Sequence, residues 1–257
     1  MIPLSPLGNT FSLTHRNLMN SSTKRVLILL ANPTTASTTG WPVGFWASEL
    51  SHPYLEFVAS GYDVTIASVS GGKVVPDAMS DPRDESEYSA HDFVSRGFFE
   101  TPALNALLEA TPALSSLDPG DFDAFLIAGG QAPMFSFRTN SELQAWIRTF
   151  YESGKPTAAL CHGVCAFLDV ELSDGTRLIT DRTITGFSNQ EEDAVNEMVG
   201  QEVMPFRIET LAREFGANFT SKGAWQSFAI RDGNLITGQQ QNSGRETAHL
   251  IIEALGR

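Results

Sequence analysis

Residues 24–30 read KRVLILL, a short continuous apolar run behind two basic side chains. An apolar run of this length without alternation is typical of a strand that is buried on both faces, as in a parallel sheet. A helical pattern begins near Trp46 and continues to about Ser60, and Gly61 then provides a C-terminal stop. Residues 63–69, DVTIASV, form a second strand-like run. The order strand, helix, strand predicts an α/β fold with a parallel sheet.

The rest of the chain continues this alternation. Two more buried strands are predicted at 123–128 and 156–160, with a helix between them that Asn140 caps and that extends to about Glu152. Residues 71–100 are rich in Gly, Pro, Asp and Ser and are expected to form a loop. The remaining expected elements are a helix at 101–108, a pair of short strands within 177–186, a helix at 205–215, a hairpin at 228–237 and a last helix at 243–255.

The chain is expected to form one domain, because no internal repeat, low-complexity tract or linker interrupts it. Residues 23–257 then make a doubly wound domain with a small inserted cap, and residues 1–22 make an N-terminal tail or arm. With 257 residues, of which 42% are apolar and 18% charged, the chain can bury a substantial core.

Charge and cysteine content argue against several classes of protein. The net charge of −13 opposes binding to nucleic-acid phosphates and anionic lipid, so we expect no nucleic-acid or membrane partner. No window approaches the roughly 18 apolar residues of a membrane span, and the N-terminus lacks the pattern of a secretory signal. Two cysteines are too few for a disulfide scaffold, and a bridge between Cys161 and Cys165 would be strained. We therefore expect reduced thiols in a cytoplasmic protein.

Residues 158–166, AALCHGVCA, connect a buried strand to a predicted helix. Cys161 then lies at the carboxyl edge of the sheet, where open α/β sheets bind ligands. The positive end of the following helix favours a thiolate, which is the nucleophilic form. His162 supplies a neighbouring imidazole, and Gly163 permits a sharp turn. These features favour a nucleophilic Cys161 over an inert core cysteine, whereas Cys165 lies inside the helix on its apolar face and is expected in the core.

A second glycine-rich turn, Gly129-Gly130-Gln131-Ala132, follows the third strand. Its backbone N–H groups could form an oxyanion hole that faces Cys161, and the alternative is an ordinary tight turn. The turn is not a Walker phosphate loop, because no Gly-Lys-Ser/Thr follows it.

Glutamates supply the candidate acids and bases near this edge. Glu49 follows the carboxyl end of the first strand closely enough for its carboxylate to reach the same crevice. Glu191 and Glu192 come directly after the stretch TGFSNQ at 185–190. One of these two could orient an imidazole, and the other is then expected to be solvated.

Histidine and cysteine spacing does not favour a metal centre. His52, His91 and His249 are scattered, and neither a His-Glu-x-x-His motif nor paired cysteines occur. A site that joins His52 to His91 or to Glu49 is the weaker alternative, so no metal and no cofactor are expected.

These pieces together resemble the DJ-1/PfpI superfamily and, within it, the Hsp31-like, glyoxalase III-type branch. The order and spacing of the matching stretches over most of residues 24–256 carry the resemblance. They are GFWASEL and HP at 44–50 and 52–53, AGG at 128–130, ALCHG at 159–163, ITGF at 184–187, and DGNLITGQ at 232–239 with Ser243. One position departs from the pattern: many Hsp31-like members read Gly-Gly-His-Gly after the third strand, where this chain has Gln131. A backbone-donor role for Gly129 and Gly130 needs N–H groups only and does not depend on that histidine.

The resemblance implies a flavodoxin-like sandwich that is usually dimeric. It implies that Cys161 is the nucleophile and that His162 is its neighbouring acid/base. Glu49 corresponds to the family glutamate that hydrogen-bonds the cysteine sulfur and tunes its acidity. Glu192 falls where Hsp31-like proteins place the acid that orients the histidine, with Glu191 one residue away from that register.

The leading hypothesis is a cofactor-independent enzyme that converts a small reactive aldehyde such as methylglyoxal to a 2-hydroxy acid such as lactate. In it, the Cys161 thiolate adds to the aldehyde, and His162 or Glu49 moves the protons of the adduct. The alternatives are a hydratase or hydrolase of another small electrophile, such as an isonitrile or amide, and a non-enzymatic holding chaperone or redox sensor. The expected partners are the small substrate and a second copy of the chain.

Overall fold

The apolar strand β1 (Arg25–Leu30) lies inside a six-stranded sheet in the computed structural model, which describes residues 23–256. The strand order is β4-β1-β5-β6-β10-β9, and every neighbouring pair is parallel except β10 and β9. The other strands of this sheet are β4 (Asp63–Ser68), β5 (Ala124–Ile127), β6 (Thr157–Leu160), β9 (Ala229–Asp232) and β10 (Leu235–Gly238). The predicted doubly wound, mostly parallel α/β sheet is confirmed, and so is the C-terminal hairpin.

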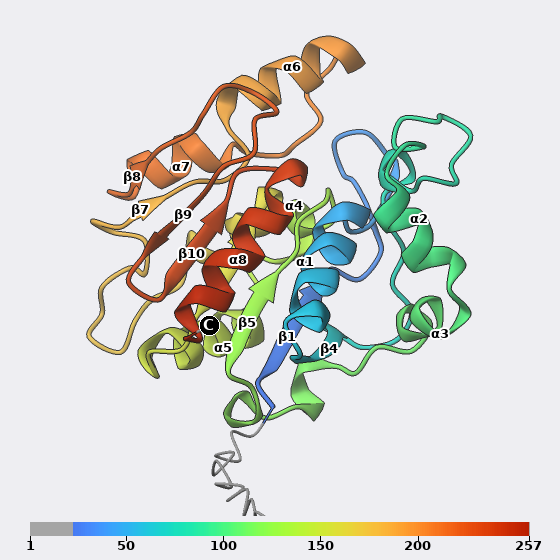
Figure 1. Cartoon of the computed structure of the whole chain (residues 1–257). Helices are drawn as coiled ribbons and strands as arrows, with labels where there is room; N and C mark the ends of the chain where they lie inside the picture. Colours follow the sequence, from blue (N-terminus) through green and yellow to red (C-terminus); the bar gives the residue numbers. More distant parts are fainter. Residues whose placement is uncertain (1–22, 257) are drawn as a thin grey trace, which may run out of the picture.

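The side chains of β1 divide between two hydrophobic cores, as a strand buried on both faces requires. Leu27 and Leu29 belong to one core, and Ile28 and Leu30 belong to the other. Helices α1 (Ala47–Ala59), α2 (Phe93–Glu100) and α8 (Gly244–Ala254) contribute to the second core, on one face of the sheet. Helix α5 (Ser141–Glu152) and the 3-10 helix η5 (Cys161–Phe167) contribute to the first core, on the opposite face (Figure 1).

The register of the parallel strands sets the position of the site. Leu29 pairs with Ile127, and Ile127 pairs with Ala159. The loops that follow β1, β5 and β6 therefore start at one edge of the sheet, where a doubly wound fold places its ligands.

The inserted cap is the segment between η5 and β9, and its first strand contacts β9 at the side of the sheet. It contains β7 (Thr183–Ile184), α6 (Asn189–Val199), α7 (Ile208–Glu214) and β8 (Asn218–Phe219), which lie together at one end of the molecule (Figure 1). The remaining elements are short: β2 (Thr34–Thr35), β3 (Pro42–Val43), η1 (Ala78–Ser80), α3 (Pro102–Asn105), η2 (Ala106–Leu108), η3 (Leu114–Ser116), η4 (Pro119–Asp121), α4 (Pro133–Ser136) and η6 (Gln241–Ser243).

Several local predictions were wrong. The expected loop at 71–100 ends in helix α2, because Asp92 caps its start by accepting a hydrogen bond from the Ser95 N–H at 3.1 Å. The expected strand pair within 177–186 is a single short strand, β7, which pairs in parallel with the distant β8 instead of with its own neighbour. The expected helix after Cys161 is a 3-10 helix.

Helix α6 is absent from the predictions, although the sequence carries its signal. Ser188 and Glu191 form a capping box in which each side chain accepts a hydrogen bond from the backbone of the other residue. The first residues of the helix are polar and acidic, and its apolar positions Val195, Met198 and Val199 come only in its second half, so the apolar stripe is short.

No helix within residues 23–256 combines the length and the apolar character that crossing a membrane requires. The predicted tail or arm at 1–22 lies outside the described residues, and its role stays a prediction.

Candidate active site

Cys161 occupies the sharp turn that ends β6. Its φ angle is +55°, in the left-handed region that residues with a side chain rarely adopt. The backbone passes so close to β5 that a Cβ atom on Gly163 would lie 2.9 Å from the Ala128 carbonyl oxygen. The strained turn therefore depends on a glycine two residues later, and it holds the Cys161 side chain, 2% exposed, at the edge of the sheet.

His162 connects the thiol to the cap. Its Nδ1 lies 3.9 Å from Cys161 Sγ, and its Nε2 lies 2.9 Å from Glu192 Oε1. His162 and Glu192 are both buried. A carboxylate at Nε2 favours the tautomer with the proton on Nε2, which leaves Nδ1 as a hydrogen-bond acceptor toward the sulfur. Of the two neighbouring glutamates, Glu192 is therefore the one that contacts the histidine.

Glu191 points into a different network and is not solvated, which corrects the sequence-based expectation. Its side chain is fully buried. Oε2 accepts hydrogen bonds from the backbone N–H and hydroxyl of Ser188, and Oε1 accepts from the Trp225 N–H at 3.0 Å and from Gln239 at 2.9 Å. Glu191 thus ties the start of α6 to the segment that carries Trp225.

Glu49 lies beside the thiol, in the first turn of α1. Its Oε2 accepts a hydrogen bond from the Gly129 N–H at 2.6 Å. Burial raises the pKa of the Glu49 carboxyl to about 8, and hydrogen bonds from Cys161 and Gly129 offset only part of this effect. At neutral pH most molecules therefore hold a proton on Glu49.

The pKa of the Cys161 thiol is also raised, which is opposite to the direction expected from the helix end. Burial is the main cause, and the charge of Glu49 adds to it, while the backbone N–H of His162 opposes it. Cys161 is the first residue of the 3-10 helix η5, and the stabilisation of the thiolate by the backbone there is smaller than the effect of burial. Cys161 and Glu49 are best described as one pair that shares its protons.

The Gly129 turn supplies fewer free donors than predicted. The N–H of Gly129 donates to Glu49, and the N–H of Gln131 donates to Asp77 Oδ2 at 2.7 Å. Within residues 23–256 the Gly130 N–H has no hydrogen-bond partner, so it is the donor of this turn that remains for an oxyanion. A Cβ on Gly129 would lie 2.7 Å from Glu49 Oε2 and 2.9 Å from Cys161 Cβ, which explains why glycine is needed here.

Asp77 is a buried residue of this site that sequence analysis did not find. Its Oδ1 accepts a hydrogen bond from the Gly44 N–H at 2.7 Å, so it joins the loop after β1 to the Gly129 turn. Burial raises its pKa to about 7, against the effect of these two backbone hydrogen bonds. Asp77 lies in a segment that was expected to be a loop, and no motif in the sequence marks it.

A small apolar cavity of about 60 Å³, the inner pocket, lies over Cys161 and His162. Aromatic and sulfur-containing side chains form most of its walls, and sequence analysis singled out none of them as part of a site. They are Trp46, Met79, Tyr88, Phe187, Met198, Met204 and Trp225. The cap and the 71–92 segment therefore place apolar side chains over Cys161 and His162.

Cys165 and the scattered histidines stay outside this arrangement. Cys165 is a free, buried thiol in the first core, as predicted, and its Sγ contacts the Pro133 carbonyl oxygen at 3.4 Å. Within residues 23–256 no group of His, Cys, Asp and Glu is arranged to hold a metal ion. His52 contacts Asp92 at 2.9 Å, and His249 contacts Glu56 at 2.9 Å.

Comparison with known proteins places this site in a family. The model of the DJ-1/PfpI family matches residues 41–254, a span that includes Glu49, Cys161, His162 and Glu192. The chain belongs to the DJ-1/PfpI family. The resemblance predicted from the sequence motifs is therefore confirmed.

Within the DJ-1/PfpI family the chain is similar to proteins named as glyoxalases. Glyoxalase 3 of Candida albicans is 29% identical over 241 residues, which cover 90% of this chain and 98% of that protein. The glutathione-independent glyoxalase HSP31 of Saccharomyces cerevisiae is 25% identical, with the same coverage. The crystal structure of glyoxalase III from Candida albicans matches with a TM-score of 0.73 and 26% identity over 90% of this chain and 97% of that one. The Rapid Encystment Protein 24 kDa of Francisella tularensis matches with a TM-score of 0.82 and 28% identity over 91% and 100% of the two chains.

Proposed function

We propose that the protein is a glutathione-independent glyoxalase that converts a 2-oxoaldehyde to a 2-hydroxy acid. The observation that carries the proposal is the buried Cys161 thiol between Glu49 and the His162–Glu192 pair. The similarity to proteins named as glyoxalases supports it. The net reaction is R–CO–CHO plus water giving R–CHOH–COOH, which balances without an external oxidant or reductant.

The first step is addition of sulfur to the aldehyde carbon. The Glu49 carboxylate takes the thiol proton, a C–S bond forms, and the carbonyl oxygen becomes the hydroxyl of a hemithioacetal. The Gly130 N–H, which has no hydrogen-bond partner among residues 23–256, is the candidate donor to this oxygen as it gains charge. The raised pKa of Glu49 makes it an effective base near neutral pH.

The second step moves a hydrogen between the two carbons of the substrate. His162 Nδ1 removes the proton from the hemithioacetal carbon, and the resulting enediol is protonated at the former ketone carbon. This produces a thioester of the 2-hydroxy acid. Water then cleaves the C–S bond and returns the Cys161 thiol. Glu192 stabilises the imidazolium and holds its orientation through the contact at Nε2.

Two of the alternative functions have less support from the geometry. A redox sensor that works through oxidation of Cys161 needs an accessible thiol of low pKa, whereas Cys161 is buried and its pKa is raised. A holding chaperone would not need the aligned Glu49, Cys161, His162 and Glu192. A hydratase or hydrolase of another small electrophile would use the same nucleophile, and a substrate panel separates it from a glyoxalase.

Formation of D- or L-lactate from methylglyoxal, without glutathione, tests the proposal directly. The wild-type protein should produce lactate, and Cys161→Ala should produce none above the rate of buffer. Cys165→Ala is the matched control, since that thiol lies in the core and should leave the activity dependent on Cys161. Lactate formation that survives Cys161→Ala would overturn the proposal.

We also propose that the active species is a homodimer built from one α/β domain per chain and located in the cytoplasm. Light scattering coupled to size exclusion should give twice the mass of one 257-residue chain. A mass equal to one chain would contradict this assembly without affecting the proposed reaction.

A further inference from the structure

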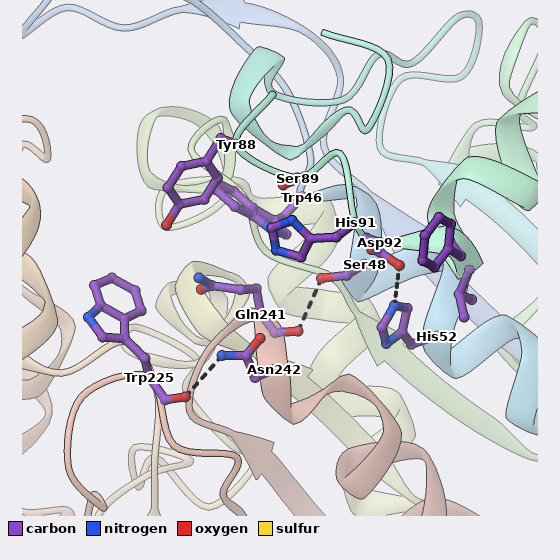
Figure 2. A pocket seen from close by; sticks show the side chains of 12 residues that line it. Trp46, Ser48, His52, Tyr88, Ser89, His91, Asp92, Trp225, Gln241 and Asn242 are labelled. Carbon is purple, nitrogen blue, oxygen red and sulfur yellow. Dashed lines mark hydrogen bonds and ion pairs between the residues drawn. The ribbon is translucent and has the colours of Figure 1, made fainter. Parts of the chain in front are cut away.

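A second, larger cavity opens beside the inner pocket. This outer cavity has a volume of about 700 Å³, and Trp46, Tyr88, Trp225 and Gln241 line both spaces. The four shared side chains therefore form the passage between the outer cavity and Cys161. Figure 2 shows Trp225 across the cavity from Trp46 and Tyr88, with the Gln241 amide extending between them.

The passage is held in place from both sides. Tyr88 and Trp46 pack in a T-shaped arrangement with ring centroids 6.3 Å apart, and Trp225 and Phe187 do the same at 5.8 Å. The backbone of Trp225 adopts a left-handed φ of +64°, and hydrogen bonds to Glu191 and from Asn242 fix it there. The surrounding structure therefore holds Trp225 in a strained backbone conformation, which is typical of residues at functional sites.

The walls of the outer cavity combine aromatic faces with polar groups that have no partner in the protein. Within residues 23–256 the side chains of His91 and Gln241 make no hydrogen bond, and both line the outer cavity (Figure 2). At the floor of the passage, Gln131 Oε1 is buried and also has no hydrogen-bond partner among the described residues. An acceptor that is buried without a partner is costly unless a ligand supplies a donor.

The sizes of the two cavities restrict the shape of the ligand. A buried aromatic ring needs a cavity of roughly 150 Å³, whereas the inner pocket has about 60 Å³. The inner pocket therefore suits the two-carbon head of a 2-oxoaldehyde and is too small to enclose an aromatic ring as well. A narrow linear chain could continue through the passage into the outer cavity.

We infer that the preferred substrates are 2-oxoaldehydes that carry a linear polyhydroxylated chain, the class formed when sugars lose water. This inference rests on the proposed glyoxalase function and extends it to the part of the substrate that does not react. The C–H groups of such a chain pack on the faces of Trp46 and Trp225, whose π-electrons attract the positive edges of C–H bonds. Its hydroxyls donate to and accept from Gln131, Gln241 and His91. An alkyl chain in the same place would bury these polar groups without partners.

The test compares substrates that differ in one property at a time. The purified protein is assayed with 3-deoxyglucosone, with 2-oxohexanal and with phenylglyoxal, and methylglyoxal serves as the reference. The first two share a six-carbon chain but differ in hydroxylation. We expect kcat/KM for 3-deoxyglucosone to exceed that for 2-oxohexanal at least tenfold, which corresponds to about 1.4 kcal/mol, and to exceed that for phenylglyoxal.

Substitutions of residues that line the outer cavity test whether this cavity causes the preference for the hydroxylated substrate. Gln241→Leu and His91→Leu should each lower the ratio of kcat/KM for 3-deoxyglucosone to kcat/KM for 2-oxohexanal by roughly fivefold to tenfold, which is the effect of one lost hydrogen bond. His249→Leu is the matched control, because His249 lies on α8 outside both cavities and should leave the ratio as it is in the wild type. The melting temperature of each variant verifies that it is folded.

Each outcome separates this inference from the proposed function. Equal or faster turnover of 2-oxohexanal or phenylglyoxal, with Cys161-dependent lactate from methylglyoxal, overturns the hydroxylated class and leaves the glyoxalase function intact. Variants that slow all substrates equally overturn the assignment to the outer cavity. Absence of turnover for all four substrates overturns the proposed function, and the inference with it.

Discussion

At the scale of single residues, the proton shared by Glu49 and Cys161 should control the rate. Glu49 accepts the thiol proton only when ionised, and its pKa of about 8 leaves a small ionised fraction at lower pH. We therefore expect kcat/KM for methylglyoxal to rise about tenfold for each step of one in pH between about pH 5 and pH 7 and to level off above about pH 8. Stopped assays of lactate across this range measure the profile.

Glu49→Gln provides the comparison for this profile. The amide cannot accept the proton, so kcat/KM should fall by roughly 10² to 10⁴ and lose the rise below about pH 8. An unchanged profile in Glu49→Gln would mean that another group receives the thiol proton.

The orientation of His162 should depend on Glu192 and not on the neighbouring carboxylates. Glu192→Gln keeps a side chain of the same shape near Nε2 but removes the charge that stabilises an imidazolium. We expect kcat to fall by about 10² with little change in KM, because the contact acts mainly in the transition state. Glu197→Gln, at an exposed position of the same helix, is the control and should behave as the wild type. A similar kcat in the two variants would remove Glu192 from the mechanism.

At the scale of secondary-structure elements, the turn between β6 and η5 depends on the close approach of two backbones. A Cβ on Gly163 would lie 2.9 Å from two carbonyl oxygens of the β5 segment, so Gly163→Ala should destabilise the fold by about 1–3 kcal/mol and displace Cys161. Urea unfolding measures the first effect, and lactate formation measures the second.

Gly97→Ala is the matched control for Gly163→Ala, and it should change the free energy of unfolding in the opposite direction. Gly97 lies inside helix α2, and a Cβ there would meet no atom within 4 Å. Gly97→Ala should therefore stabilise the protein by roughly 0.5–1 kcal/mol through helix propensity. Equal effects at the two positions would contradict the role assigned to the close approach at Gly163.

At the scale of the whole molecule, the site carboxyls impose a pH dependence on stability. Glu49 and Asp77 have pKa values of about 8 and about 7 in the folded protein, above their ordinary values of 4.5 and 3.8. Between these limits the folded state binds more protons than the unfolded chain, so the free energy of unfolding decreases as pH rises from about 4 to 8. Asp92 has the opposite effect, because its pKa in the folded protein is lowered to about 2. Its contribution to the free energy of unfolding is lost only as the pH falls below about 4.

Urea unfolding at about pH 5 and about pH 8 tests this sign. The wild type should lose free energy of unfolding between the two conditions, and Glu49→Gln should lose less, because one of the two carboxyls with a raised pKa is gone. A tenfold difference in proton affinity between the folded and unfolded states is worth about 1.4 kcal/mol, so the effect is measurable. A larger loss in Glu49→Gln than in the wild type would show that Glu49 is ionised in the folded protein.

The sequence by itself determined the sheet and the turn at Cys161, because both arise from local patterns. The unbroken apolar run at β1 specifies a strand buried on two faces, and the order of elements specifies parallel pairing. The stretch from Ala159 to Gly163 specifies the strand, the cysteine and the glycine of the turn within a few consecutive residues. The family followed from the same short motifs.

Only the tertiary structure decided the surroundings of the thiol, because they come from segments far apart in the chain. The choice between Glu191 and Glu192 depends on the direction in which α6 faces, and a difference of one residue turns a side chain by about 100° around a helix. Asp77 and Trp225 reach the site through loops that carry no periodic pattern. The pKa of Cys161 was expected to be low from the helix predicted after it, and it is raised because the covering chain removes water from the thiol and the charge of Glu49 opposes a thiolate. Desolvation is set by everything that packs around a group, and no local stretch of sequence contains that information.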